Sequence, residues 1–411
     1  MLRSLRMSAT LPFGSNNRRI SFLRLLEFVV QVFTSTHSYN VLYAIRCIIP
    51  EHASAFHEPA LDVLWKEIDG LAPLVKCFPA DAWAVERSWQ TSPKRLNMTR
   101  PLLAQDWTVV LTYANRIKAL SYDIYGGPNL DPNVLQALLV FRPTLILFPK
   151  LHKLHWRQGL SNLSAMITLI GPELKTLEVF MRSSSEDDIG VIKSTSAYIG
   201  ARCPNLESVT FVDMFGITPP VLDVGNFIAS SKCLQHFMCL DNITCSQSSL
   251  LALAKLENLL ELRLRLPDGM CFPALMGFET FPALRHLTIR GHFRECLNFF
   301  EAMDLARLET LQIVVDSRRD HLNIRSLLTA IRFGPDHFRM TTINLHIRAE
   351  PSASMSLISS DDIRHYLSSA IYGRSLFSRR LSLVKGLCTR IWLLHGRTSS
   401  PYAFSCHQKL R

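Results

Sequence analysis

The sequence has no apolar run long enough to cross a membrane as a helix, which takes about 20 residues. Its most apolar stretch near the N-terminus, SFLRLLEFVVQVF, is shorter than that and carries Arg24 and Glu27. Paired cysteines are lacking as well, because none of the ten cysteines belongs to a CxxC motif. These absences argue against a membrane protein, against the common zinc modules and against a disulfide framework.

Motifs of enzyme active sites are also missing. The chain has no GxGxxG or GxxxxGK[ST] loop to cradle phosphates, no HExxH metal site and no GxSxG nucleophile turn. A catalytic site would have to be assembled from scattered residues. We therefore expect a non-catalytic protein that uses neither a cofactor nor a metal.

Acidic residues are scarce at both ends of the chain. The formal net charge is +11, yet residues 1–50 hold six arginines against the single acid Glu27, and residues 371–411 hold eight basic residues and no acid. The body between them is close to neutral, so nucleic acid is the least favoured class of partner. The acid-free first 26 residues also fit a mitochondrial transit peptide, which is the alternative to a cytoplasmic or nuclear location.

A six-residue motif recurs along the body of the chain. Its form is Φ-x-x-Φ-x-Φ, where Φ is apolar, and successive copies start 23 to 34 residues apart. The last four positions of each copy alternate, as expected of a short strand with one buried face. The nine copies are IKALSY, LHKLHW, LKTLEV, LESVTF, LQHFMC, LLELRL, LRHLTI, LETLQI and MTTINL, starting at residues 117, 151, 174, 206, 234, 259, 284, 308 and 340.

Segments with helical periodicity lie between several copies and start at Asp187, Ser246, Arg294 and Ile324. A strand followed by a helix cannot bury its apolar face alone, but stacked copies of the unit can. The sequence therefore predicts an α/β fold of the leucine-rich-repeat type, an irregular solenoid or horseshoe with parallel strands inside and helices outside. A generic α/β sheet is the alternative, which we disfavour because such a sheet would not repeat the same six-residue motif in strand after strand.

The outward strand positions would line the concave face of this horseshoe, the usual binding surface of a solenoid. Arg263, Arg265, His286 and Arg290 come from adjacent units, so we expect them to lie near one another. Such a patch would suit an acidic or phosphorylated segment of a protein substrate, although ordinary solvated strand faces have the same composition. The predicted substrate-binding residues are Glu178, Thr210, His236, Glu261, Arg263, Arg265, His286 and Arg290.

The stretch FHEPALDVLWKEIDGLAPLV, residues 56–75, predicts one amphipathic helix. Apolar residues that include Leu61, Trp65 and Ile68 follow at three-and-four spacing, and Pro59 suits the first turn. We expect Trp65 to be a structural anchor that pins the preceding helices to the segment after it.

Several blocks resemble the fungal F-box proteins with irregular leucine-rich repeats. LLEFVVQVF and NVLYAIRC look like the F-box helices, and EPALDVLWKEIDGLAPLVKCFPADAW is similar to the segment that follows the F-box in that family. DWTVVLTYANRIKALSYD resembles the helix that leads into the first repeat. The F-box itself is degenerate, because the Leu-Pro start before Leu25 and the Trp shortly after Cys47 are missing.

The resemblance implies a substrate-recognition subunit of an SCF-type cullin-RING ubiquitin ligase. Its F-box-like helices would bind a Skp-type adaptor and thereby the cullin, while the concave face would hold the target protein. The alternative is a non-catalytic leucine-rich-repeat interaction scaffold with a non-functional F-box. The adaptor-binding residues, which could equally fill a small internal core, would be Leu25, Leu26, Val29, Val41 and Leu42.

The predicted organisation has five parts. They are a disordered basic N-terminus (1–20), an F-box-like helical segment (21–70), a helical linker or cap (71–114), the leucine-rich-repeat solenoid (115–373) and a basic, disordered tail (374–411).

Overall fold

The computed structural model describes most of the body of the chain, in two compact units, Met1–Val63 and Leu64–Arg411. All the strands given below belong to the second unit. The described residues are 54–86, 95–123, 129–157, 163–180, 187–213, 221–270, 280–303, 305, 307–317, 326–327, 330–331, 342–349 and 388–395.

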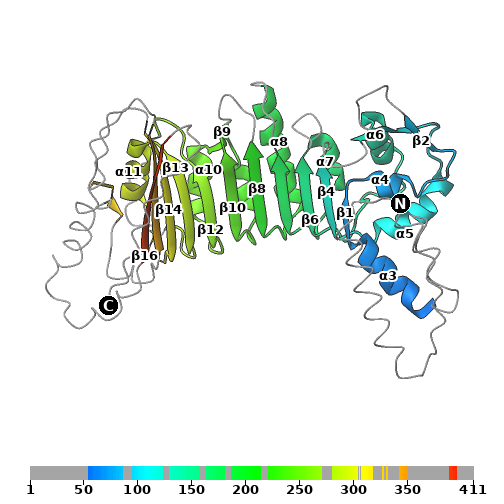
Figure 1. Cartoon of the computed structure of the whole chain (residues 1–411), viewed down its shortest axis with the longest axis horizontal. Coiled ribbons are helices and arrows are strands. Elements are labelled where there is room, and N and C mark those ends of the chain that lie inside the picture. The colour runs from blue at the N-terminus through cyan, green and yellow to red at the C-terminus, as the bar shows by residue number, and fades with distance from the viewer. Residues whose placement is uncertain are drawn as a thin grey trace, which may run out of the picture. The chain divides into compact units, whose positions relative to one another are not determined.

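Within those residues, the second unit is built on one sheet of 13 strands in which every pairing is parallel (Figure 1). The strands of its main path neighbour one another in chain order, and the short strands β9 (Val221–Leu222) and β11 (Thr244–Cys245) pair beside that path. The main path is β1 (Glu67–Asp69), β4 (Ala119–Asp123), β6 (Lys153–Arg157), β7 (Thr176–Phe180), β8 (Ser208–Asp213), β10 (His236–Asp241), β12 (Glu261–Arg265), β13 (His286–Gly291), β14 (Thr310–Ser317), β15 (Thr342–Ala349) and β16 (Cys388–His395).

Each of the nine hexad motifs forms a strand, from β4 to β15, so this part of the prediction is confirmed. The first apolar residue of a motif closes a tight turn, as when the N–H of Leu174 donates to the carbonyl of Gly171 at 3.1 Å. The carbonyl of Lys175 then accepts two N–H groups of the next strand segment, those of Glu207 and Ser208, at 2.8 and 2.9 Å. The same pattern, in which one carbonyl accepts from two successive N–H groups, recurs along the sheet and sets the register of successive strands.

The helices follow the strands along the chain, and those from α6 to α10 pack on one another in sequence (Figure 1). Side chains cap the start of α6 and α10, since Asp131 accepts from the N–H of Asn133 and Ser246 accepts from the N–H of Ser249. The predicted helices starting near Asp187, Ser246 and Arg294 are confirmed as α8, α10 and α11. The bounds are α3 (Ser54–Lys66), α4 (Ala72–Val75), α5 (Trp107–Ala114), α6 (Pro132–Val140), α7 (Leu163–Leu169), α8 (Asp187–Arg202), α9 (Gly225–Ser230), α10 (Gln247–Ala254) and α11 (Phe293–Ala302), with a 3-10 turn at Ala104–Asp106.

The predicted fold class has to be corrected. The structure is an α/β protein with one large parallel sheet, and the expected leucine-rich-repeat horseshoe behind a small helical head is wrong. The described connections are unlike one another, with helices of 4 to 16 residues, and the described part of the connection from β12 to β13 is not helical. The hexad led to the wrong fold class because it indicates only a short strand that buries alternate residues, and this alternation does not determine how the segments between the strands fold.

The single helix expected over residues 56–75 is also wrong. Helix α3 stops at Lys66, and Ile68 lies in β1 opposite Leu120 of β4. Gly70 then adopts a φ of +86°, a conformation that other residues rarely take, and its N–H donates to the Ser121 carbonyl at 2.7 Å. The edge strand of the sheet therefore interrupts the apolar periodicity that predicted a helix.

Two further segments contain strands that were not expected. The presumed helical linker contributes β2 (Trp83–Glu86) and β3 (Arg95–Met98), which pair in antiparallel fashion, and β3 pairs with β5 (Asn129–Leu130) in parallel. In the presumed disordered tail, β16 pairs in parallel with β15.

Candidate functional site

The two faces of the main sheet differ in what covers them. In β7, Leu177 and Val179 are buried, whereas Thr176, Glu178 and Phe180 on the opposite face are half-buried. The same alternation holds in β4, β6, β8, β10, β12 and β13, apart from buried residues at the ends of β8 and β13. We call the face that carries the half-buried side chains the open face.

Parallel register arranges the open face in three rows that run across the strands. All eight residues predicted to bind a substrate lie in these rows, between β7 and β13. The first row is Thr176, Ser208, His236, Glu261, His286 and Thr310; the second is His155, Glu178, Thr210, Met238, Arg263, Thr288 and Gln312; the third is Asp123, Arg157, Phe180, Val212, Leu240, Arg265, Arg290 and Val314.

Glu261 is the centre of one charged cluster on the open face. Its carboxylate accepts from Nε of Arg263 at 2.7 Å and lies 3.3 Å from Nδ1 of His236 on the adjacent strand. Partial burial acts to raise the pKa of Glu261, but the hydrogen bond and charge of Arg263, with His236, outweigh it and lower that pKa. Glu261 is therefore ionised at neutral pH.

Asp316 is the centre of a second charged cluster. Its carboxylate accepts from Nε of Arg290 at 2.8 Å, and Nη2 of Arg265 lies 3.7 Å away. Nη1 of Arg265 also donates to the side-chain oxygen of Asn242 at 3.4 Å. One carboxylate from β14 thus holds two arginines that come from β12 and β13.

Glu178 belongs to a third cluster near β6. Nδ1 of His155 lies 2.7 Å from its carboxylate, and Nη2 of Arg157 lies 3.8 Å away. The Arg157 guanidinium carbon sits 4.3 Å above the centre of the Phe180 ring, a cation–π contact. Arg157 also lies 3.7 Å from Asp123.

The single basic patch expected from the sequence is therefore divided. Arg263 pairs within its own strand, Arg265 and Arg290 share Asp316, and the exposed His286 belongs to neither cluster. Thr210 lies between the charged clusters, in the middle of the second row.

Sequence reasoning missed Asp316, Arg157 and the apolar members of the third row. The hexad ends one position before that row, so Phe180, Val212 and Leu240 fell outside it. Extending the strand alternation by one residue would have found them. No local signal marks Asp316 as the partner of arginines in two other strands, because that pairing depends on register.

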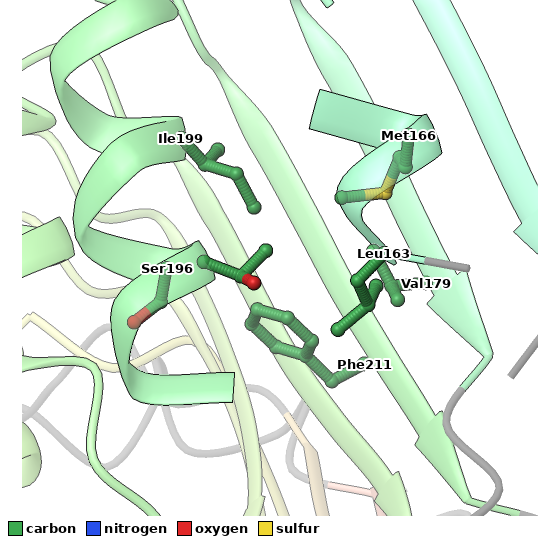
Figure 2. A pocket seen from close by; sticks show the side chains of 7 residues that line it. Leu163, Met166, Val179, Ser196, Ile199 and Phe211 are labelled. Atoms are coloured by element: carbon green, nitrogen blue, oxygen red, sulfur yellow. The ribbon is translucent and has the colours of Figure 1, made fainter. Parts of the chain in front are cut away.

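The opposite face of the sheet contributes to the core. A small apolar cavity of about 10 Å³ lies between α7, α8 and strands β7 and β8, lined by residues such as Met166, Ile199 and Phe211 (Figure 2). That volume is no larger than the space for one water molecule, so the cavity is a packing gap and not a ligand site.

Trp65 is buried on α3, as a structural anchor would be. Its ring stacks on Tyr113 of α5, with the ring centres 4.5 Å apart and an interplanar angle of 17°. The predicted adaptor-binding residues Leu25, Leu26, Val29, Val41 and Leu42 lie outside the described residues.

Metal-ion sites and membrane-spanning helices are not found among the described residues. No group of three or more His, Cys, Asp or Glu side chains there could hold a metal ion. Over the same residues, every helix is too short or too polar to cross a bilayer.

Comparisons with known proteins add no assignment. No family model matches the chain, and no curated protein matches it.

Proposed function

We propose that this protein is a non-catalytic recognition subunit that binds a partner protein on the open face of its parallel sheet. The observation that carries the proposal is the open face itself. Over β7, β8 and β10, the side chains of Phe180, Met238 and Leu240 are only half-buried and lie beside Thr210. Apolar side chains in the middle of a polar surface, with charged groups around them, are typical of protein interfaces.

The sequence resemblance to fungal F-box proteins supports a more specific proposal. The bound partner would be a target for ubiquitination, and residues 21–70 would recruit a Skp-type adaptor and a cullin. The subunit would then accelerate ubiquitin transfer by raising the effective concentration of the target near the charged enzyme.

The missing Leu-Pro before Leu25 favours a second candidate, an interaction scaffold that lacks a working adaptor site. The two candidates share the open face and differ only in adaptor binding. A single purification can therefore separate them.

The experiment uses the tagged full-length chain and two double variants, after all three are shown to have the same melting transition. Thr210→Arg with Met238→Arg fills the middle of the open face, and Leu26→Asp with Val29→Asp changes the presumed adaptor site. Co-purified proteins are quantified by mass spectrometry. Lys193→Gln, at an exposed position on α8, is the control for a changed surface charge.

A ligase receptor should lose its target with the first variant and its adaptor with the second, and each variant should keep the other partner. A scaffold should lose its partner with the first variant and show no adaptor with any. If the open-face variant retains every partner of the parent protein, the proposed function is wrong.

A further inference from the structure

In two of the three charged clusters on the open face, the accessible charge is positive. The Arg157 side chain is 44% exposed, against 24% for Asp123 and 23% for Glu178. Arg263 is 48% exposed, against 19% for Glu261. The carboxylates thus lie lower, while the guanidinium groups reach outward.

These two arginines also retain hydrogen-bonding capacity. A guanidinium has five N–H donors, and Arg263 uses its Nε and Nη2 groups on Glu261. The two carboxylates nearest to Arg157 lie at 3.7 and 3.8 Å, which is too long for a hydrogen bond. An incoming carboxylate can therefore bind each arginine without displacing its internal partner.

An apolar strip separates the two arginines. In the third row, the half-buried Phe180 and Leu240 flank the buried Val212 on the strands between Arg157 of β6 and the arginines of β12, and the half-buried Met238 lies alongside in the second row. Phe180 is held in place by the guanidinium of Arg157, which lies over its ring. The strip therefore offers an apolar contact between two basic positions.

The spacing of the two basic positions selects the shape of a ligand. From β6 to β12 the sheet takes four steps between neighbouring strands, through β7, β8 and β10. At about 4.8 Å a step, the two arginines are about 19 Å apart across the strands, which an extended peptide spans with about six residues at about 3.3 Å each.

We propose that the open face binds an extended acidic segment of a partner protein, running across the strands. An apolar side chain of the segment would lie on the strip of Phe180, Met238 and Leu240. Aspartate or glutamate residues about six positions apart would bind Arg157 and Arg263. This inference rests on the proposed function and adds the chemistry of the partner.

The test is selection of random twelve-residue peptides, displayed on a carrier, against the purified full-length protein. Enriched peptides are then synthesised and their affinities measured by fluorescence anisotropy. We expect enriched sequences to carry two acidic residues separated by five to seven positions, with an apolar residue between them. Affinity should fall as salt rises, because the end contacts are ionic.

Four charge variants test the ionic contacts, and their expected effects differ. Arg263→Gln removes a charged donor and should weaken binding about tenfold, as should Arg157→Gln. Glu261→Gln removes a negative charge beside Arg263, which would repel an incoming carboxylate, and should strengthen binding. Lys193→Gln removes the same unit of charge from α8 and should leave the affinity unchanged.

The outcomes separate this inference from the proposed function. The proposal of an acidic ligand would be wrong if neutral or basic peptides were enriched, or if no peptide were enriched. It would also be wrong if peptide affinities did not change in the Arg157→Gln and Arg263→Gln variants. If the Thr210→Arg, Met238→Arg variant still loses its protein partner in that event, only the chemistry of the partner is wrong. If it retains the partner, the proposed function fails as well.

Discussion

At the scale of single residues, Trp65 gives the sharpest expectation for stability. Its side chain is buried and stacks on Tyr113, so removing the ring leaves a large cavity. We expect Trp65→Ala to lower the free energy of unfolding by roughly 3 to 5 kcal/mol, measured by urea denaturation. Val63→Ala is the matched control, because Val63 is exposed on the same helix and should change stability little. An unchanged urea midpoint for Trp65→Ala would show that the ring is not an anchor.

At the scale of elements, two glycines in α8 should respond to alanine with opposite signs. A Cβ at Gly190 would meet no atom within 4 Å, so Gly190→Ala should raise the free energy of unfolding by about 0.5 to 1 kcal/mol through helix propensity. A Cβ at Gly200 would lie 3.0 Å from the carbonyl oxygen of Phe227 in α9. Gly200→Ala should therefore lower the free energy of unfolding by about 1 to 3 kcal/mol. Thermal denaturation of both variants tests this, and equal shifts would contradict close packing of α8 on α9.

A buried carboxylate links the segment after β3 to the start of α5. Asp106 accepts from Nη1 of Arg100 at 2.7 Å and from the N–H of Leu103 at 2.8 Å. These two hydrogen bonds, with that of Arg100 first, hold the pKa of Asp106 below its usual range against the opposing effect of burial. The ionised form therefore stabilises the fold at neutral pH.

The pH dependence of this link has a definite sign. Because the folded pKa lies below the unfolded value of about 3.9, the stabilisation is complete above that pH and is lost as the pH falls through the folded pKa. We expect Asp106→Asn to be less stable than the parent at pH 7, with the difference shrinking below about pH 4. Urea midpoints across this range give the measurement, with Asp62→Asn as an exposed control. A difference that stays constant down to pH 2 would rule out the charged link.

At the scale of the whole sheet, protection of backbone amides should depend on the position of the strand. Among the described residues, strand β1 has three residues and one neighbour, whereas β8, β10 and β12 are paired on both sides. Opening β1 costs less buried surface, so its amides should exchange first and those of the central strands last. Hydrogen exchange followed by mass spectrometry checks this order. Equal protection of β1 and β10 would contradict it.

The sequence by itself determined the nine strands that carry the hexad motif, because the signal for each of them is local. An apolar residue closes each turn and alternation buries one face, and both are visible in motifs such as LKTLEV and LRHLTI. The helices α8, α10 and α11 followed from periodicity in the same way. Over residues 56–75 the apolar spacing predicted one helix, and this prediction was wrong because Ile68 lies in a strand that pairs with β4, about 50 residues further along the chain.

Only the tertiary structure decided the fold class and the chemistry of the open face. A hexad cannot tell a solenoid from another large parallel sheet, since both give a strand the same buried face. It also cannot show that Asp316 forms ion pairs with both Arg265 and Arg290, or that the guanidinium of Arg157 lies over the Phe180 ring. Those contacts join residues about 23 to 51 positions apart, and they exist because parallel pairing brings successive strands side by side.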